Sequence, residues 1–409
     1  MGKTIGFIGA GQFAGGFARL FKLHPDIDRV YATDVVPERA EAMNTKLGLD
    51  GTYSSFEEML RSDCDAVAIF TQRWTHGPLV VQALRAGKHV YSAVPMATEI
   101  SHIEEIVGLV EETGLIYMMG ETSYYNPATI FAREKLARGE FGRVFYSEGD
   151  YVHDMDNGFY DAYRFSGGER WKETASYPPM LYPTHSIGGV LGALPTRAVS
   201  VSCLGVPDAA GDGVFDRDVS MFDNDFSNCS ALFELADGGI LRTNEMRRVG
   251  YTSGKRESRF RFFGTEAVFE QNAVLSVWHT KAAIDDVSAL LETEPVVRDT
   301  EEHADIPAGL RDSFLSGSAP IQDRSRLPQE FTGAVNGHEG AHHFLVDDFV
   351  RSLVSGDHPP VDVWMAARFT APGIVAHRSA QTGGARLEIP DFGDRPRALR
   401  DDAVDGGAA

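Results

Sequence analysis

The first 120 residues alternate short apolar runs with amphipathic segments of helical period. Each helical segment ends at a glycine, a common C-cap, and Pro37 begins one of them, where its missing N–H costs nothing. This alternation predicts βαβ units and a doubly wound parallel sheet. The apolar runs that we expect to form its strands are 4–10, 29–34, 65–71, 89–94 and 116–121.

After about Pro127 the pattern changes to alternating polar and apolar residues, which favours an antiparallel sheet with one covered face. Two helical segments, 341–356 and 363–384, close the pattern. The expected strands lie within 143–154, 197–206, 228–246, 257–271 and 273–279.

The predicted fold class is therefore α/β: a Rossmann dinucleotide-binding domain over 1–125, followed by an α+β domain over 126–393 with an open, mainly antiparallel sheet. Residues 291–335 show little periodicity and predict a long surface excursion, and the polar tail 394–409 is expected to be loose.

Composition narrows the function classes. The net charge of −21 disfavours nucleic acid and anionic membranes as partners, since both require basic surface. No apolar run approaches the roughly 20 residues that span a bilayer, and glycines interrupt the N-terminal run too early for a signal peptide. Three scattered cysteines do not form a disulfide framework. We expect a cytoplasmic protein with a small-molecule substrate.

One stretch is locally basic. Its members either face solvent from alternating strand positions, or one or two of them point into a pocket and hold an anionic group. They are Arg242, Arg247, Arg248, Lys255, Arg256, Arg259 and Arg261.

The segment from Gly9 to Ala14 is a G-x-G-x-x-A fingerprint between a predicted strand and a predicted helix. The first glycine permits the tight turn, and Gly11 lets a pyrophosphate approach the backbone at the helix N-terminus. Gln12 and Phe13 complete this cofactor loop. Asp34, at the end of the second strand, would accept hydrogen bonds from the ribose of NAD and repel the 2′-phosphate of NADP, although Arg39 is close enough in sequence to reach that site. The sequence therefore predicts NAD.

With this fingerprint, the stretch 67–97 and the following antiparallel domain, the chain resembles the Gfo/Idh/MocA oxidoreductases over nearly its whole length. The resemblance implies oxidation or reduction of a sugar or cyclitol carbon, and a homodimer or homotetramer formed through the open sheet. It also places further residues at the cofactor, namely Thr71, His76, Pro95 and Glu121.

Two departures from the family pattern stand out. Val94 precedes Pro95 where the family carries the lysine that assists its catalytic base. Tyr182 and His185 lie three residues apart, with Leu181 in the place of the usual aspartate. Both changes resemble the family's oxidoreductive glycosidases, such as the NAD-dependent α-N-acetylgalactosaminidases.

That resemblance implies glycoside cleavage without net redox. NAD takes a hydride from a ring carbon, usually C3, the ketone acidifies the C2–H, the C1 substituent leaves by elimination, water adds and the hydride returns. We predict Tyr182 and His185 as the catalytic pair, since histidine titrates near neutrality, whereas tyrosine would need a lowered pKa. The alternative is that both are satisfied core residues.

Several other residues are candidates for substrate contacts, and some of them have an alternative structural interpretation. Tyr124 and Asn126, beside Tyr125, follow the last strand of the nucleotide domain and are either ligand contacts or a capped loop. His153 and Asp154 either line the sugar pocket or face solvent. The remaining candidates are Arg164, Arg170 and Lys172.

Residues 338–342 read H-E-G-A-H, which on a helix would hold zinc. Gly340 weakens such a helix and no third ligand stands out, so we predict no metal and place His338 at the sugar pocket instead.

Two other functions stay open. One is a net NAD-dependent sugar or cyclitol dehydrogenase, and the other is a non-catalytic sensor of nucleotide. The sugar is not encoded, although the basic stretch hints at a sulfonated or carboxylated one.

Overall fold

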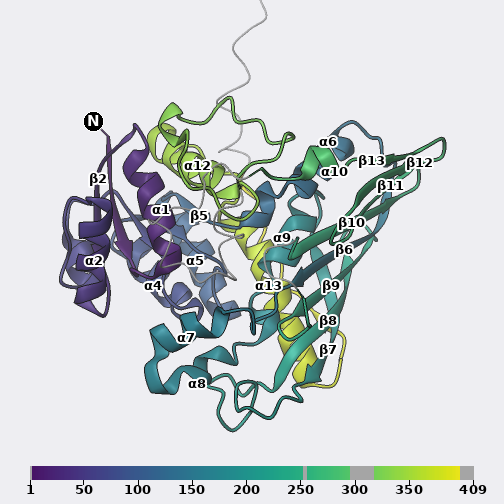
Figure 1. The fold of residues 1–409 in the computed structure, drawn as a ribbon, viewed down its shortest axis with the longest axis horizontal. Helices are drawn as coiled ribbons and strands as arrows, with labels where there is room; N and C mark the ends of the chain where they lie inside the picture. Colours follow the sequence, from purple (N-terminus) through teal and green to yellow (C-terminus); the bar gives the residue numbers. More distant parts are fainter. Residues whose placement is uncertain (1, 252–255, 295–316, 397–409) are drawn as a thin grey trace, which may run out of the picture.

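The computed structural model describes residues 2–251, 256–294 and 317–396 (Figure 1). None of the helices in these ranges is long and apolar enough to cross a membrane. Lys255, part of the predicted excursion and most of the predicted tail lie outside the described residues.

The N-terminal domain is a five-stranded parallel sheet in the order β2-β1-β3-β4-β5. Its strands are buried on both faces, as expected for a sheet covered by crossover helices. The strands are β1 (Lys3–Ile8), β2 (Ile27–Thr33), β3 (Ala66–Ile69), β4 (His89–Ser92) and β5 (Tyr117–Met119). The helices are α1 (Gln12–Leu23), α2 (Pro37–Leu47), α3 (Phe56–Arg61), α4 (His76–Arg85) and α5 (Ile100–Thr113).

The second sheet has nine strands in the order β13-β12-β11-β10-β6-β9-β8-β7-β14. All neighbours are antiparallel except β6 and β9, which run parallel. The strands are β6 (Val144–Val152), β7 (Ala198–Pro207), β8 (Phe226–Leu235), β9 (Ile240–Met246), β10 (Ser258–Gly264), β11 (Ala267–Gln271), β12 (Ser276–Thr280), β13 (Ile284–Asp286) and β14 (Leu387–Glu388).

Helices cover the face of this sheet that looks toward the first domain (Figure 1). Helix α13 lies along β7, α9 lies on β6, and α12 packs against α1 of the nucleotide domain. The helices are α6 (Pro127–Ala137), α7 (Phe159–Gly167), α8 (Trp171–Ala175), α9 (Thr184–Leu191), α10 (Ser288–Leu291), α12 (Ala341–Ser355) and α13 (Val363–Gln381). Short 3₁₀ turns include η1 (Arg73–Thr75), η2 (Thr122–Tyr125) and η4 (Pro179–Leu181).

The predicted fold class is confirmed: a parallel Rossmann sheet is followed by a mixed, mainly antiparallel sheet. The period-two pattern did not reveal α6, α7 and α8, which lie between the predicted strands. The start of the predicted loose tail is held in place, because Arg395 Nε lies 2.8 Å from Asp362 and Arg368 pairs with Asp394.

Glycines set how closely α9 approaches its neighbours. A Cβ at Gly149 of β6 would fall within 3.0 Å of the Ser186 carbonyl oxygen, and one at Gly189 would fall that close to the Phe260 ring. Real Cβ atoms do not approach other atoms so closely. Helix α9 therefore sits on the sheet at a distance that only glycine allows at these two positions.

We expect Gly149→Ala and Gly189→Ala each to lower the free energy of unfolding by about 1–3 kcal/mol, because overpacking displaces α9 from the sheet. Thermal or urea unfolding measures the effect. Gly108→Ala is the control: Gly108 is an exposed residue of α5 with nothing within 4 Å of an added Cβ, so alanine there should be neutral or slightly stabilising. Equal destabilisation by all three variants would contradict the packing argument.

Candidate active site

One cavity of about 760 Å³ runs from the carboxyl edge of the parallel sheet to the second domain. Its walls include Gly9 and Asp34 at one end and Tyr182, His185 and Arg247 at the other. Ligands of doubly wound domains bind at this edge of the sheet. The cavity is thus continuous from the predicted nucleotide loop to the predicted catalytic pair.

The nucleotide end has the form of a phosphate cradle. Gly9 has φ of +94°, and an added Cβ there would meet the Phe70 carbonyl. Gly11 is the N-cap of α1 and has open space where a Cβ would lie. The first turn of α1 has no side-chain cap and no acidic residue, so its N–H groups remain available to an anion. Gln12 begins this helix, and Phe13 lines the cavity.

Asp34 follows β2 and is fixed from both sides. Its Oδ2 accepts the Ala10 N–H at 2.7 Å and its Oδ1 accepts the Val36 N–H at 2.8 Å. A carboxylate held here fits the ribose hydroxyls of NAD. Arg39, which could have favoured NADP, donates to the Phe165 carbonyl at 2.9 Å and stacks on the Phe165 ring.

The loop after β3 closes the middle of the cavity. Thr71 and His76 both line it, and the imidazole of His76 contacts the carbonyls of Thr71 and Pro95 at 3.1 and 2.9 Å. Pro95 is buried, and its carbonyl contacts the His76 imidazole, but the residue does not line the cavity. Val94 does line the cavity, and the described lining residues include no lysine. The chemistry of a lysine must therefore come from other groups.

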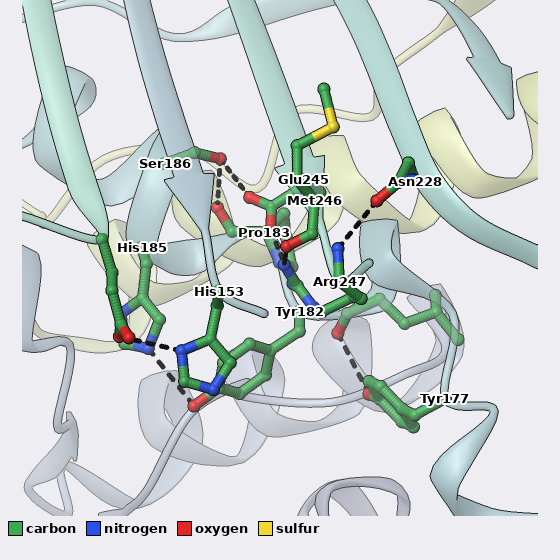
Figure 2. A network of polar contacts seen from close by, with 12 residues as sticks. His153, Tyr177, Tyr182, Pro183, His185, Ser186, Asn228, Glu245, Met246 and Arg247 are labelled. Atoms are coloured by element: carbon green, nitrogen blue, oxygen red, sulfur yellow. Dashed lines mark hydrogen bonds and ion pairs between the residues drawn. The ribbon is translucent and has the colours of Figure 1, made fainter. Parts of the chain in front are cut away.

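Glu121, His185 and Tyr182 form a linked unit at the far end. Figure 2 shows the contact between His185 and Tyr182. His185 Nδ1 lies 2.8 Å from Glu121 Oε1, and His185 Nε2 lies 3.3 Å from the Tyr182 hydroxyl. A carboxylate accepts only, so the contact assigns the proton of a neutral His185 to Nδ1 and leaves Nε2 as the acceptor of the Tyr182 proton. Such an arrangement prepares a histidine to act as a general base.

Glu121 was predicted at the cofactor, but the structure places it behind His185. Its side chain is 0% exposed. Burial pushes its pKa upward, but the charge and hydrogen bond of His185, together with hydrogen bonds from Thr184 and the Ser123 backbone, outweigh burial, so the net pKa of Glu121 lies below its ordinary value. Glu121 is therefore a charged group that orients the imidazole rather than a wall of the nucleotide site.

The pKa of Tyr182 lies above its ordinary value because the ring is buried, while the Arg73 guanidinium opposes that shift. The sequence argument needed a lowered pKa for Tyr182, and the pKa is shifted in the opposite direction. This direction and the contacts of the imidazole make His185 the better candidate for a base.

Arg73 is a residue that sequence reasoning missed. It lines the cavity, donates a hydrogen bond to the Tyr163 hydroxyl and lies 4.4 Å from the centre of the Tyr182 ring. Within the described ranges, no carboxylate forms an ion pair with it. An arginine that is held among tyrosine rings and keeps its charge uncompensated can bind an anion. Arg73 lies within the stretch 67–97, but nothing in its sequence neighbourhood marked it as a ligand-binding residue.

The basic stretch behaves differently. Arg247 alone of its described members lines the cavity, and it is ion-paired with buried Glu245 at 2.6 Å. Burial raises the pKa of Glu245 to about 7, against the opposing effects of Arg247 and Ser186. Arg242 and Arg261 pair with Glu148, and Arg248 pairs with Asp208 and Asp212. Most of the charge of the stretch is thus neutralised by neighbouring carboxylates.

His153 lines the cavity and is 4% exposed, and Asp154 is also buried, so neither faces solvent. His338 lines the cavity too, with its ring centre 6.1 Å from that of His185. The helix after it begins only at Ala341, and Nδ1 of His338 lies 2.8 Å from Nε2 of His342. The H-E-G-A-H motif is therefore a turn in which the two histidines contact each other, and Glu339 bonds to Asn126.

Five candidates lie outside the cavity. Asn126 caps α6 through its side chain, and Tyr124 packs under Arg133. Arg164 pairs with Asp161, Arg170 pairs with Glu173, and Lys172 donates to the Asp212 carbonyl at 2.6 Å. Sequence reasoning placed the last three near the sugar, whereas α7 holds Arg164, the 3₁₀ turn Gly168–Arg170 holds Arg170, and α8 holds Lys172, all outside the cavity. Neighbouring residues of α7, among them Phe159 and Tyr163, line the cavity instead.

Comparison with known proteins supports the architecture. Residues 3–121 match the Gfo/Idh/MocA model, described as an oxidoreductase family with an NAD-binding Rossmann fold. A glycosyl hydrolase family 109 protein of Streptomyces niveus is 25% identical over 411 residues, which is 95% of this chain and 77% of that protein.

Solved structures that are similar to this chain include two dehydrogenases. Levoglucosan dehydrogenase in complex with NADH and levoglucosan superposes with a TM-score of 0.71 at 15% identity, covering 96% of this chain and 100% of that one. Myo-inositol 2-dehydrogenase from Lactobacillus plantarum gives a TM-score of 0.68 at 16% identity, covering 95% and 100%. The sequence resemblance is confirmed: the nucleotide domain belongs to the Gfo/Idh/MocA oxidoreductases, and NAD is its cofactor.

We expect Asp34→Asn to weaken NAD binding about 10- to 100-fold, because a hydrogen bond to a charged group contributes about 1.5–3 kcal/mol. The loss of charge should narrow the preference for NAD over NADP. Calorimetric titration with both nucleotides measures this. Glu41→Gln serves as the control, since it removes a carboxylate of α2 that does not line the cavity. Equal affinity of Asp34→Asn and the unaltered protein for NAD would contradict the assignment.

Proposed function

We propose that this Gfo/Idh/MocA enzyme is an NAD-dependent glycoside hydrolase that cleaves a sugar glycoside through transient oxidation of the ring, C1–C2 elimination, water addition and re-reduction. The observation that carries the proposal is the Glu121–His185–Tyr182 unit in a cavity whose described lining holds no lysine. The similarity of the chain to a glycosyl hydrolase family 109 protein, over 95% of its length, supports the same reaction class.

The nucleotide cradle fits NAD. Gly9 and Gly11 would admit the pyrophosphate at the N-terminus of α1, and Asp34 would bind the ribose. When bound, NAD supplies reversible removal of a hydride from a sugar carbon. The residues at the other end of the cavity must then move the protons.

His185 is the base for the sugar hydroxyl. Its Nδ1 proton is held by Glu121, so Nε2 can accept a proton and the resulting imidazolium is stabilised by the Glu121 carboxylate. Glu121 thereby keeps the imidazole in one orientation. In the family pattern a lysine assists the base, whereas Val94 stands at that position in this chain.

Tyr182 acts with His185 on the C2 proton. Once the hydroxyl proton has passed from His185 to water, the Tyr182 hydroxyl can give its proton to His185 Nε2 while it takes the C2 proton. The ketone formed at C3 acidifies the C2–H, and its removal drives the C1 substituent from the ring. The Arg73 guanidinium next to the Tyr182 ring favours any negative charge on the phenol oxygen.

The proposed sugar carries an anionic group, a sulfonate or a carboxylate. Arg247 does not support this, because Glu245 neutralises it. Arg73 does, since it lines the cavity without an ion-pair partner in the described parts of the chain. An arginine in a partly enclosed site binds such oxygens through two parallel N–H groups.

A net sugar or cyclitol dehydrogenase is the second candidate, favoured by the catalytic histidine that such a reaction also needs. The two reactions differ in one observable: a net dehydrogenase accumulates NADH with turnover, whereas the hydrolase does not.

We also propose a homo-oligomer formed through the outer face of the second sheet. Leu204, Leu232 and Ile240 are exposed there, on strands β7, β8 and β9. Apolar side chains exposed on three neighbouring strands support an interface there.

The reaction is tested with NAD and a panel of 4-nitrophenyl glycosides in heavy water, with neutral hexosides, N-acetylhexosaminides, uronides and 6-sulfonated hexosides. We expect nitrophenol release, deuterium at C2 of the sugar product and no growth of NADH absorbance. Steady NADH growth without nitrophenol would establish the dehydrogenase instead. His185→Gln should reduce turnover by at least about 100-fold, the usual contribution of a general base, with NAD affinity unchanged. Tyr182→Phe should suppress the C2 deuterium as well.

Arg73 is tested through substrate preference. We expect Arg73→Gln to lower kcat/KM for an anionic glycoside about 10- to 100-fold more than for its neutral counterpart, because one charge-assisted contact contributes about 1.5–3 kcal/mol. Arg73→Lys should retain part of the preference. Arg170→Gln, at an exposed site outside the cavity, is the matched control. Equal losses on both substrates would remove Arg73 from anion recognition.

A further inference from the structure

The cavity holds a second histidine–carboxylate pair. His153 Nδ1 lies 2.8 Å from Glu257 Oε2, and both residues line the cavity (Figure 2). The pair comes from the second domain: His153 directly follows β6, and Glu257 precedes β10. The reaction steps assigned to Tyr182 and His185 do not use it.

Two aromatic rings clamp the His153 imidazole. It stacks on Tyr151 at 5.0 Å between ring centres, and Phe159 of α7 meets it edge-on at 3.8 Å. Its backbone N–H is also bonded, to the Met246 carbonyl. Its Nδ1 is held by Glu257, and its Nε2 has no hydrogen-bond partner among the described residues. A fixed, 96%-buried imidazole thus presents one free nitrogen in the cavity.

The two histidine pairs flank one ring. Tyr151 lies 4.7 Å from His185 and 5.0 Å from His153, measured between ring centres. Of the two, the His185 pair is the one anchored to the nucleotide domain, through Glu121. The His153 pair is anchored only to the second domain. A substrate ring in this cavity would therefore meet one pair on its cofactor side and the other pair beyond it.

This elimination needs a base and an acid in succession. A base takes the C2 proton, and an acid gives a proton to the glycosidic oxygen while the base still holds the C2 proton, so the two are separate groups. Tyr182 and His185 form a single hydrogen-bonded unit and serve as the base. The leaving oxygen requires a separate donor.

We propose that His153, oriented by Glu257, is the catalytic acid that protonates the leaving glycosidic oxygen and the base that then activates the attacking water. This role rests on the proposed glycosidase function. Loss of the C2 proton leaves an enolate. Its electrons then re-form the C3 carbonyl and make the C1–C2 double bond as the C1–O bond breaks, and the aglycone oxygen takes a proton from Nε2 of the His153 imidazolium. The neutral imidazole then takes a proton from water while its oxygen adds to C1, and C2 regains a proton from the Tyr182–His185 unit. Protons and electrons balance without another reactant.

The same sheet offers a matched pair outside the cavity. His279 of β12 lies 3.2 Å from Glu270 of β11, and neither lines the cavity. His279→Gln therefore removes a histidine–glutamate contact from this sheet without touching the site.

The experiment compares His153→Gln, Glu257→Gln and His279→Gln with the unaltered protein, each loaded with NAD. The probes are the 4-nitrophenyl and methyl glycosides of the sugar that the panel identifies, assayed in heavy water. Aglycone release is measured together with deuterium at C2 of the recovered, uncleaved glycoside. Methoxide needs a proton to leave, whereas nitrophenoxide leaves without one.

For His153→Gln we expect release in the first turnover, which precedes water addition, to fall at least about 100-fold for the methyl glycoside and to change by less than about 3-fold for the nitrophenyl glycoside. The uncleaved methyl glycoside should gain deuterium, because proton removal at C2 continues while departure stalls. Glu257→Gln should show the same pattern more weakly, and His279→Gln should show none.

Equal losses on both glycosides, or loss of the C2 deuterium, would overturn the role and make His153 a binding or structural residue. The proposed function fails differently: the unaltered protein would then release no aglycone from any glycoside and exchange no deuterium.

Discussion

The close contact of α9 with the elements around it is the constraint on which the site depends. Gly149 and Gly189 let the helix lie against β6 and β10, and a Cβ at Gly188 would fall within 3.0 Å of the Glu121 side chain. Because α9 carries His185, this contact brings an imidazole of the second domain against a carboxylate of the first. A displacement of α9 by one side chain's width would break the bond between them. The catalytic unit is therefore a product of backbone packing as much as of the residues themselves.

The nucleotide half of this protein could be predicted from its sequence, because its signals are local. The fingerprint at Gly9 and Gly11, the carboxylate after β2 and the apolar strand runs each act within a few residues, and the structure has them as expected. The second domain was predictable as a sheet, since alternation reports which face is covered. The helices α7 and α8 were not, because with 9 and 5 residues they are too short to stand out by period, and they form one wall of a cavity that exists only in three dimensions.

The residues at the far end of the cavity could be predicted only where they lie close together in the sequence. Tyr182 and His185 lie three apart and were found, whereas Arg73 and Glu257 meet the cavity from distant segments. Charge counting along the sequence pointed to the stretch 242–261, yet partners from other strands neutralise most of it. Arg73, a single arginine without such a partner in the described structure, carries more weight for an anionic ligand than the whole stretch. What matters for recognition is the uncompensated charge in the cavity, and compensation depends on tertiary contacts.

The missing lysine now has a physical explanation. A lysine beside a histidine supplies a cation that keeps a sugar alkoxide stable and the histidine neutral. In this cavity Arg73 supplies a cation next to Tyr182, and Glu121 replaces the aspartate as the group that orients the imidazole. Arg73 comes from the loop after β3 rather than from the position of Val94, although both residues line the cavity. A positive charge thus reaches this cavity from a different segment of the chain than the family pattern gives it.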